Sequence, residues 1–306
     1  MKCRDSALYY EEQVSEMMEL KDPTLADLDA LRIQSGIRER KSAPKNMNVH
    51  QFIIYFAHGY LMNECRDGIT MYQLPQRDII PLCQPVPHEN NRGIKKGGFS
   101  FTTNQRFIEV LAKCASPRER RPKGYPPREA WIRSKIKDLL IEANTAEHRL
   151  KTPFSCAHSI EVWRENELVG GAILLQIGAA IISMSLFSHY DCAGKAIGVF
   201  MQKIMINGGF KMHDSGIRSN FSDYFHARLI DNKIATDMRL DLIFVPLDFP
   251  NISDKIPFDQ IAAIKKTESG WSLPCEESHA EVEEPDGDQA RCKKALILHQ
   301  KMGLGV

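Results

Sequence analysis

The sequence lacks the closely spaced ligand pairs that mark metal and redox sites. Its eight cysteines include no Cys-x-x-Cys pair, and its ten histidines form neither His-x-x-x-His nor His-Glu-x-x-His. Zinc sites usually carry such spacings. We therefore expect no metal site and no bound cofactor, and we expect the cysteines to be reduced thiols.

A long apolar run is also missing. The longest run begins at Leu168, and Gln176 and Gly178 interrupt it well short of the length that spans a bilayer. The first thirty residues carry many carboxylates and no apolar segment, which argues against secretion. We expect a cytoplasmic protein that does not enter a membrane.

The chain has no strong net charge. Its 40 Lys and Arg residues are balanced by 39 Asp and Glu, so no overall field indicates a partner. The composition, 43% apolar and 26% charged, is ordinary for a globular protein. We expect a monomer with four parts: a charged extension (1–44), a small amino-terminal domain (45–96), a main domain (97–255) and an acidic tail without fixed structure (256–306).

The stretch from Cys156 to Ser188 carries the clearest pattern in the chain. Ile160 and Val162 recur at a spacing of two, as in a half-buried strand. The nearly continuous apolar run over 168–176 is typical of a strand buried on both faces, and a third run follows over 180–187. Short turns separate the three runs, which predicts an antiparallel meander.

The flanking regions add helices and strands. Upstream we expect helices over 49–60, 104–114 and 131–144 and a strand over 99–102. Downstream we expect a helix over 192–207 that Asp191 caps and Gly209 ends, a strand over 210–213, a helix over 222–231 and a strand over 240–245. This order predicts an α+β fold of the acyltransferase-like (GNAT-like) type, with helices flanking a mixed sheet.

The residues from His158 to Gly171, HSIEVWRENELVGG, resemble the signature of the leucyl/phenylalanyl-tRNA–protein transferase family. The resemblance covers about residues 48 to 250. It continues through 103–107, 114–116, 131–132, 185–188, 193–195 and 209–214, and Gly59 and Arg77 fall at matching places.

This resemblance implies an enzyme that transfers leucine, phenylalanine or another apolar amino acid from aminoacyl-tRNA to the N-terminal amine of a protein. The family's acceptor proteins begin with Arg or Lys, and the added residue marks them for N-degron proteolysis. The aminoacyl ester is already activated. The enzyme must therefore bring the amine to the ester carbonyl, relay a proton and stabilise the oxyanion.

The resemblance implies catalytic roles at Asp214 and at the position two residues beyond it. The family has a glutamine at that position, where Gly216 stands here, and His213 and His226 are candidate substitutes. Asp214 is a candidate to accept the proton of the amine or to hold the amine. The alternative is a plain turn-forming carboxylate. Because it lies at a strand end, we expect Asp214 to contribute little to the core. Asp191, Asp214 and Asp223 are candidates for an acidic mouth that receives Arg or Lys.

The resemblance also implies an apolar pocket for the aminoacyl-adenosine. The matching residues are Ala172, Ile181, Met184, Gly198, Met201 and Met205, with Trp131 as a stacking surface for the terminal adenine. Ala172 and Gly198 are smaller than the family's residues, so we expect a wider cavity. Met184 replaces a glutamate, and Asn63 replaces a second tryptophan, for which Tyr60 is a candidate substitute. An ordinary apolar core would explain these residues equally well.

A basic stretch runs from Lys113 to Lys137 and holds nine Lys and Arg residues against two glutamates. Such an imbalance favours contact with a phosphate backbone, and the resemblance implies that the acceptor stem of a tRNA docks there. The candidate contacts are Arg118, Arg120, Arg121, Lys123 and Arg133. The alternative is a solvated loop and helix face.

Two other functions stay open at this point. An acyl-coenzyme A N-acyltransferase would need a glycine-rich loop before the helix that follows the strands, and 188–195 contains a single glycine. A binding module that holds tRNA or basic N-termini without turnover would explain the departures at Asn63, Met184 and Gly216. A transfer assay separates the binding module from the enzyme.

Overall fold

A computed structural model describes residues 39–65, 68–116, 131–151, 155–217, 219–267 and 270–272. The helices are α3 (Val49–Ala57), α4 (Arg92–Lys96), α5 (Phe107–Cys114), α6 (Ser134–Asn144), α7 (Ala146–Lys151), α8 (Ala193–Gly208), α9 (Asn220–Tyr224), α10 (Asn232–Leu242) and the 3₁₀ helix η1 (Phe258–Ala263). The strands are β1 (Glu39–Ser42), β2 (Tyr60–Cys65), β3 (Gly68–Gln73), β4 (Gln76–Ile80), β5 (Phe99–Thr103), β6 (Ala157–Arg164), β7 (Glu167–Ile177), β8 (Ala180–Ser188), β9 (Met212–Gly216), β10 (Arg228–Asp231), β11 (Ile256–Pro257), β12 (Lys265–Thr267) and β13 (Gly270–Ser272).

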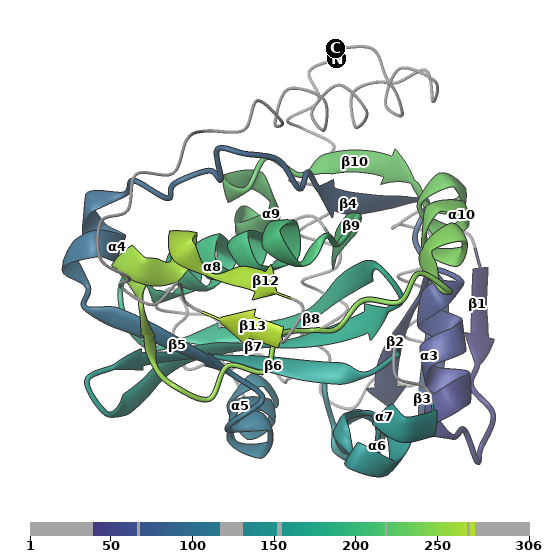
Figure 1. The fold of residues 1–306 in the computed structure, drawn as a ribbon. Helices are drawn as coiled ribbons and strands as arrows, with labels where there is room; N and C mark the ends of the chain where they lie inside the picture. Colours follow the sequence, from purple (N-terminus) through teal and green to yellow (C-terminus); the bar gives the residue numbers. More distant parts are fainter. Residues whose placement is uncertain are drawn as a thin grey trace, which may run out of the picture. The chain divides into compact units, whose positions relative to one another are not determined.

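Eight strands form the main sheet, in the order β10-β4-β9-β8-β7-β6-β5-β11 (Figure 1). Every neighbouring pair in it is antiparallel except β8 and β9, which run parallel. Helix α8 makes the crossover that a parallel connection requires. Strands β1, β3 and β2 form a second sheet, and β12 pairs with β13. The expected mixed sheet with flanking helices is thereby confirmed.

The expected meander and the helix after it are both present, but the expected cap by Asp191 is wrong, because Cys192 is the N-cap and its side chain makes no capping hydrogen bond. Strand β7 lies between β6 and β8 and pairs antiparallel with each. It is buried from Leu168 to Ile177, because apolar layers cover both faces of the sheet there. Helix α8 ends at Gly208, and the C-cap Gly209 has a φ of +79°, the left-handed conformation that glycine adopts without strain.

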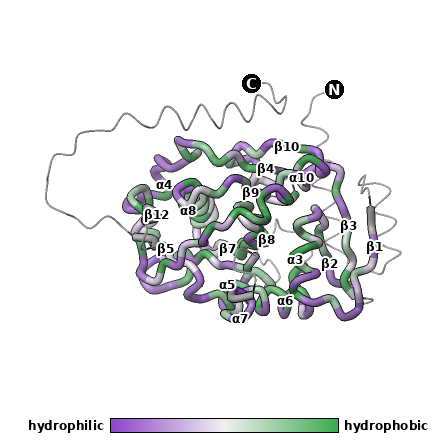
Figure 2. Tube along the Cα trace, turned by 45° about the vertical axis from the view of Figure 1, so that its right-hand side comes forward, coloured by the Kyte–Doolittle hydropathy of each residue, from purple (hydrophilic) through white to green (hydrophobic). Residues whose placement is uncertain are grey.

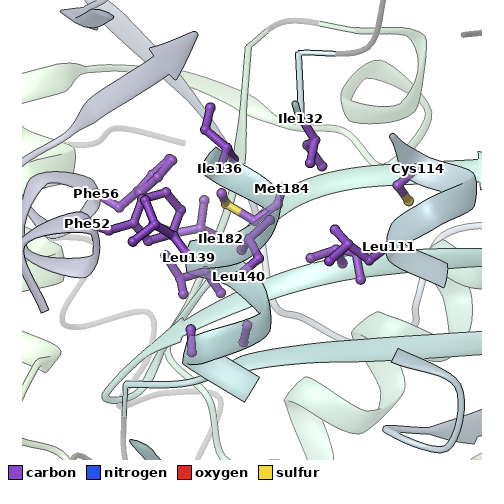
Figure 3. Close-up of a cluster of buried hydrophobic side chains, with 14 of the residues drawn as sticks. Phe52, Phe56, Leu111, Cys114, Ile132, Ile136, Leu139, Leu140, Ile182 and Met184 are labelled. Atoms are coloured by element: carbon purple, nitrogen blue, oxygen red, sulfur yellow. The ribbon is translucent and has the colours of Figure 1, made fainter. Parts of the chain in front are cut away.

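Apolar side chains pack against both faces of the main sheet. The first layer lies against α3, α5 and α6, and it includes Phe52, Leu111 and Leu140 (Figure 3). The second layer lies against α8, where Phe200 stacks on Phe101 of β5 with 4.4 Å between ring centroids. Figure 1 shows α5 and α6 on one side of the sheet and α8 and α9 on the other. In Figure 2, hydrophobic positions recur along the central strands, and hydrophilic ones gather at the outer turns.

Glu161, in the middle of β6, fixes the start of α5. Its carboxylate accepts hydrogen bonds from the hydroxyls of Thr102 (2.6 Å) and Ser159 (2.5 Å) and from the backbone N–H of Arg106 (3.3 Å). Arg106 is the N-cap of α5 and makes no side-chain cap itself. A carboxylate from a neighbouring strand thus supplies the acceptor that the first N–H groups of a helix need.

Two expected elements near the end of the main domain are wrong. The segment 240–245, expected as a strand, contains the end of α10 and the turn after it, and 222–231, expected as a helix, contains β10 and only part of α9. The buried face of α10 consists of Asn232, Ala235 and Arg239. Two of these residues are polar, so their helical spacing is invisible in a hydrophobicity pattern.

The packing also crosses the expected domain boundaries. Strand β4 lies within 45–96, yet it pairs with β9 and β10 in the main sheet. Beyond residue 255, Phe258, Ile261 and Ile264 are buried in the layer under α8. These segments are short, and nothing in their own sequence indicates which sheet or layer they join. No helix among the described residues is long and apolar enough to cross a membrane.

Candidate functional site

The parallel strand pair of the main sheet separates at its carboxyl end. Strands β8 and β9 are joined at three residue pairs, of which Ile182 with Asp214 is the last. Strand β8 then continues to Ser188 beside β7, whereas β9 ends at Gly216 beside β4. Ligands of open sheets commonly bind beyond the carboxyl ends of strands, where neighbouring connections diverge. We therefore place the candidate site where β8 and β9 separate.

Asp214 lies at this end of β9 and is completely buried. Its carboxylate accepts hydrogen bonds from Nε (3.2 Å) and Nη2 (3.0 Å) of Arg77 in β4 and from Nη1 of Arg239 in α10. The backbone N–H of Gly216 also donates to it, at 2.8 Å. Both arginine side chains are 0% exposed. We call Arg77, Asp214 and Arg239 the buried ion cluster. Asp214 is thus the shared counter-ion of two cations, and the expectation that it contributes little to the core is wrong.

The charge state of Asp214 follows from these partners. Burial by itself raises the pKa of the carboxyl, but the guanidinium groups of Arg77 and Arg239 outweigh burial and hold the pKa below its ordinary value. The carboxylate stays ionised, and its oxygens already accept from several donors. Such a group is a poor acceptor for the proton of an amine, whereas it positions two arginines well.

The buried ion cluster also joins the amino-terminal helix α3 to the main sheet. Nε of Arg239 donates to the carbonyl of Ala57, the last residue of α3, at 3.2 Å. Nearby, a Cβ on Gly59 would lie 2.5 Å from Oγ1 of Thr236 in α10. Only glycine therefore allows α10 to pack this closely against the turn after α3, which explains the glycine at this position.

Gly216 stands at the position for which the resemblance implies a glutamine, and its backbone conformation explains why a glycine is present. Its φ is +83°, a conformation in which other residues are strained. Among the described residues, a Cβ built on Gly216 would have only Nη2 of Arg77 within 4 Å, at 3.9 Å. Backbone conformation, and not lack of space, therefore selects glycine here.

We expect Gly216→Gln to lower the free energy of unfolding by about 1–3 kcal/mol, because a non-glycine residue is strained at positive φ. Urea denaturation measures the loss. Gly194→Ala in α8 is the control, since a Cβ there meets its nearest neighbour at 3.5 Å, an ordinary contact. A Gly216→Gln protein as stable as the wild type would show that the backbone accepts a side chain at this position.

His213 precedes Asp214 and contacts side chains of β8 and α8. Its Nε2 lies 2.8 Å from the hydroxyl of Ser183 in β8, and that hydroxyl lies 3.8 Å from the sulfur of Met201 in α8. His213 is completely buried, and burial lowers its pKa to about 4, so the ring is neutral at pH 7. The other candidate substitute, His226, is exposed. Sequence reasoning named His213 and missed Ser183, which no motif marks.

The expected pocket residues separate into two groups. Ala172, Ile181, Met201 and Met205 belong to the layer under α8. Met184 belongs to the opposite layer and lies among side chains of α3 and α6 (Figure 3). Ile181 and Met184 are an odd number of positions apart on one strand, so they point to opposite faces. No single face of the sheet therefore carries the whole set.

The space beside Gly198 is filled. A Cβ on Gly198 would lie 2.1 Å from Cε2 of Phe225 and 3.0 Å from Cε2 of Phe221. Aromatic rings from α9 and the residue after it therefore occupy the volume that a larger side chain would take. The expectation of a wider cavity at Gly198 is wrong.

Trp131 lies before α6 and not within it. The helix begins at Ser134, where Glu64 of β2 accepts hydrogen bonds from the hydroxyl of Ser134 and from the backbone N–H groups of Lys135 and Ile136. Trp131 is half-buried and packs against the layer that contains Met184. A stacking surface at Trp131 therefore lies on the Met184 side of the sheet.

Neither Asn63, at the position of the second tryptophan, nor its candidate substitute Tyr60 exposes a ring on which a base could stack. Asn63 is buried in β2. Tyr60 is also buried, and Nζ of Lys41 lies 4.2 Å from the centroid of its ring. A cation at this distance occupies the ring face on which a base would stack. Of Trp131, Tyr60 and Asn63, only Trp131 is partly exposed and could stack on a base.

Most of the basic stretch lies outside the described residues, including Arg118, Arg120, Arg121 and Lys123. Arg133 is described, and it occupies the half-buried N-cap position of α6. The tRNA contacts stay a prediction. In the described part of the chain, no group of three His, Cys, Asp or Glu residues is placed to hold a metal ion.

Comparison with known proteins identifies several relatives. The leucyl/phenylalanyl-tRNA–protein transferase of Nitrobacter winogradskyi is 27% identical over 222 residues, which cover 69% of this chain and 92% of that protein. The protein of the same name from Chlorobaculum parvum is 29% identical over 174 residues, 56% of this chain and 82% of that protein. Among solved structures, the C-terminal domain of a protein described as a lysylphosphatidylglycerol synthetase from Agrobacterium fabrum matches 55% of this chain and 63% of that chain. Its TM-score of 0.34 and 10% identity are too low to carry an argument.

The family model of leucyl/phenylalanyl-tRNA protein transferase matches residues 81–238. This range contains β8, α8 and β9, where Ser183, Met201, His213 and Asp214 lie, whereas Arg77 and Arg239 of the buried ion cluster lie just outside it. The match covers more than half of the 306 residues, and the chain therefore belongs to the leucyl/phenylalanyl-tRNA protein transferase family.

Proposed function

We propose that this protein is an aminoacyltransferase that moves leucine or phenylalanine from its tRNA to the N-terminal amine of a protein. The observation that carries the proposal is the family match over 81–238, because it includes β8, α8 and β9, between which the candidate site lies. The acceptor is a protein that begins with Arg or Lys, which the transfer marks for N-degron proteolysis. Neither a metal nor a cofactor takes part.

The transfer reaction mainly requires the protein to position the amine and the ester. The amine attacks the carbonyl carbon of an activated ester, and a ribose oxygen leaves. The buried ion cluster positions Arg77 and Arg239 and holds β4, β9 and α10 together at the site. Asp214 therefore maintains the geometry of the site. The proton that the amine releases is accepted by another group.

The position of the aminoacyl-tRNA end follows from the two groups of pocket residues. Trp131 and Met184 lie on one face of the sheet, and Met201 and Met205 lie on the other. A substrate that contacts both groups must pass between β8 and β9 beyond Ile182, where the strands separate. In this acyltransferase-like (GNAT-like) arrangement the adenosine stacks near Trp131, and the apolar side chain enters the layer under α8.

The contacts with the tRNA body and with the acceptor protein lie outside the place where β8 and β9 separate. The acceptor stem of the tRNA binds the basic stretch, with Arg133 at the start of α6 as its described member. Asp191 is exposed and lies two residues before α8, and Asp223 is exposed within α9, so both can attract a cationic N-terminus. Asp214 is excluded from this role because it is buried and already paired with two arginines.

Peptide-dependent discharge of tRNA tests the choice of substrate. The protein is incubated with one aminoacyl-tRNA at a time and a peptide beginning with Arg, and the remaining charged tRNA is measured. We expect leucyl-tRNA and phenylalanyl-tRNA to be discharged at least about tenfold faster than tRNA carrying a polar amino acid, because each buried apolar group contributes about 1.5–3 kcal/mol. The same peptide with an acetylated N-terminus is the control. Equal discharge of polar and apolar aminoacyl-tRNAs would contradict an apolar pocket.

A further inference from the structure

We propose that Ser183 is a catalytic hydrogen-bond donor to the ester carbonyl oxygen and that His213 is the residue that positions it. This inference deepens the proposed function and rests on it. No family motif marks Ser183. It lies one residue beyond Ile182, the last residue of β8 that pairs with β9, and it is half-buried. Its hydroxyl therefore lies where the two strands begin to separate.

The surroundings of the hydroxyl decide which way its proton points. Ser183 Oγ has two neighbours at hydrogen-bonding distance: Nε2 of His213 at 2.8 Å and the sulfur of Met201 at 3.8 Å. Nδ1 of His213 is buried and has no partner among the described residues. A buried N–H without an acceptor is rarer in proteins than a buried acceptor without a donor. This favours the tautomer in which Nε2 carries the hydrogen and donates it to Ser183.

With its oxygen accepting from His213, the Ser183 hydroxyl turns its own proton toward Met201. A thioether sulfur is a weak acceptor, so the hydroxyl readily redirects this hydrogen bond to a stronger acceptor that enters the same space. Burial keeps the imidazole neutral at pH 7, so only one ring nitrogen carries a hydrogen, and in this tautomer that nitrogen is Nε2. The ester carbonyl of a substrate whose side chain contacts Met201 brings such an acceptor.

The step needs no additional reactant. The amine nitrogen forms a bond to the carbonyl carbon, and the carbonyl electron pair moves onto the oxygen, to which Ser183 donates. When the carbonyl re-forms, the bond from carbon to the ribose oxygen breaks, and that oxygen takes up the proton that the amine releases. Ser183 keeps its proton throughout. One preorganised donor to an oxyanion typically contributes about 10²–10³-fold in rate, which offsets the absence of a side chain at Gly216.

The test compares variants of Ser183 in single-turnover transfer from charged tRNA to a peptide. Ser183→Ala is expected to lower the rate about 10²-fold at saturating charged tRNA, while the affinity for charged tRNA changes less than about threefold. Ser183→Thr, which keeps the hydroxyl, is expected to retain most of the rate. Ser253→Ala, at an exposed serine away from the site, is the matched control and should transfer at the wild-type rate. Should Ser183→Ala not fold, Ser183→Cys provides the same comparison, because a thiol is a weak donor of similar size.

A double-mutant cycle tests the positioning role of His213. If His213 acts through Ser183, adding His213→Phe to Ser183→Ala should cause little further loss of rate, although His213→Phe alone lowers it. Additive losses in the cycle would overturn the positioning role. A wild-type rate for Ser183→Ala in an active protein would overturn the donor role alone. A wild-type protein that transfers nothing would overturn both this inference and the proposed function.

Discussion

Replacing Asp214 by asparagine is expected to lower the free energy of unfolding by about 3–5 kcal/mol, the usual loss when a buried ion pair is left without one partner. The amide removes the negative charge that Arg77 and Arg239 share, and both guanidinium groups stay 0% exposed. An asparagine side chain also has only one oxygen that accepts, whereas both oxygens of Asp214 accept from Arg77. The folded state therefore loses hydrogen bonds and keeps two buried cations.

Urea denaturation at pH 7 measures this effect. Asp237→Asn is the matched control, because Asp237 is an exposed carboxylate on α10, the helix that carries Arg239. It should change stability by less than about 0.5 kcal/mol. An Asp214→Asn protein within about 1 kcal/mol of the wild type would show that the cluster is not a determinant of stability.

Acidification is expected to destabilise the fold steeply below pH 6.5, because two buried imidazoles stay neutral in the folded chain. Burial lowers the pKa of His158 to about 3, aided by the positive charge of Arg149, and burial lowers the pKa of His213 to about 4. The ordinary value for both is 6.5. Between 6.5 and about 4, the unfolded chain binds protons at both positions and the folded chain does not. Each histidine then removes about 1.4 kcal/mol of stability per pH unit.

The measurement is a series of urea titrations between pH 7 and pH 4.5. We expect a combined slope near 2.7 kcal/mol per pH unit below pH 6, and His158→Gln or His213→Gln should each remove about half of it. His50→Gln, at an exposed histidine of α3, should leave the slope unchanged. If the double variant His158→Gln/His213→Gln keeps the wild-type slope, other groups cause the acid sensitivity.

The sequence predicts those parts of the fold whose pattern is local. Strand β7 was predictable because its apolar run is nearly continuous, and the end of α8 was predictable because Gly208 and Gly209 come shortly after its last apolar residue, Ile206. Helix α10 was not predictable, because two of the three residues on its buried face, Asn232 and Arg239, are polar and resemble residues of a solvated segment. Local patterns record which residues are apolar, and they do not record which polar residues find partners after folding.

The candidate site was predictable only in part, for a similar reason. Asp214 and Arg77 are 137 positions apart, so no spacing in the sequence indicates that they pair. The resemblance placed Asp214 in the site, but only the contacts show that it is a counter-ion. The separation of Ile181 from Met184 was available from strand parity. The sequence did not predict that Phe225 fills the space beside Gly198, because this contact depends on how α9 packs against α8.

The most direct test of the central claim is the mass of an acceptor peptide after incubation with the protein and charged tRNA. A peptide that begins with Arg is mixed with leucyl-tRNA and phenylalanyl-tRNA, and the same peptide with an acetylated N-terminus is treated in parallel. The account predicts that the free peptide gains one leucine or phenylalanine at its N-terminus, that an equal amount of tRNA is discharged, and that the acetylated peptide stays unchanged. If the protein binds charged tRNA but neither peptide gains mass, the transferase account is contradicted, and a module that binds without turnover replaces it.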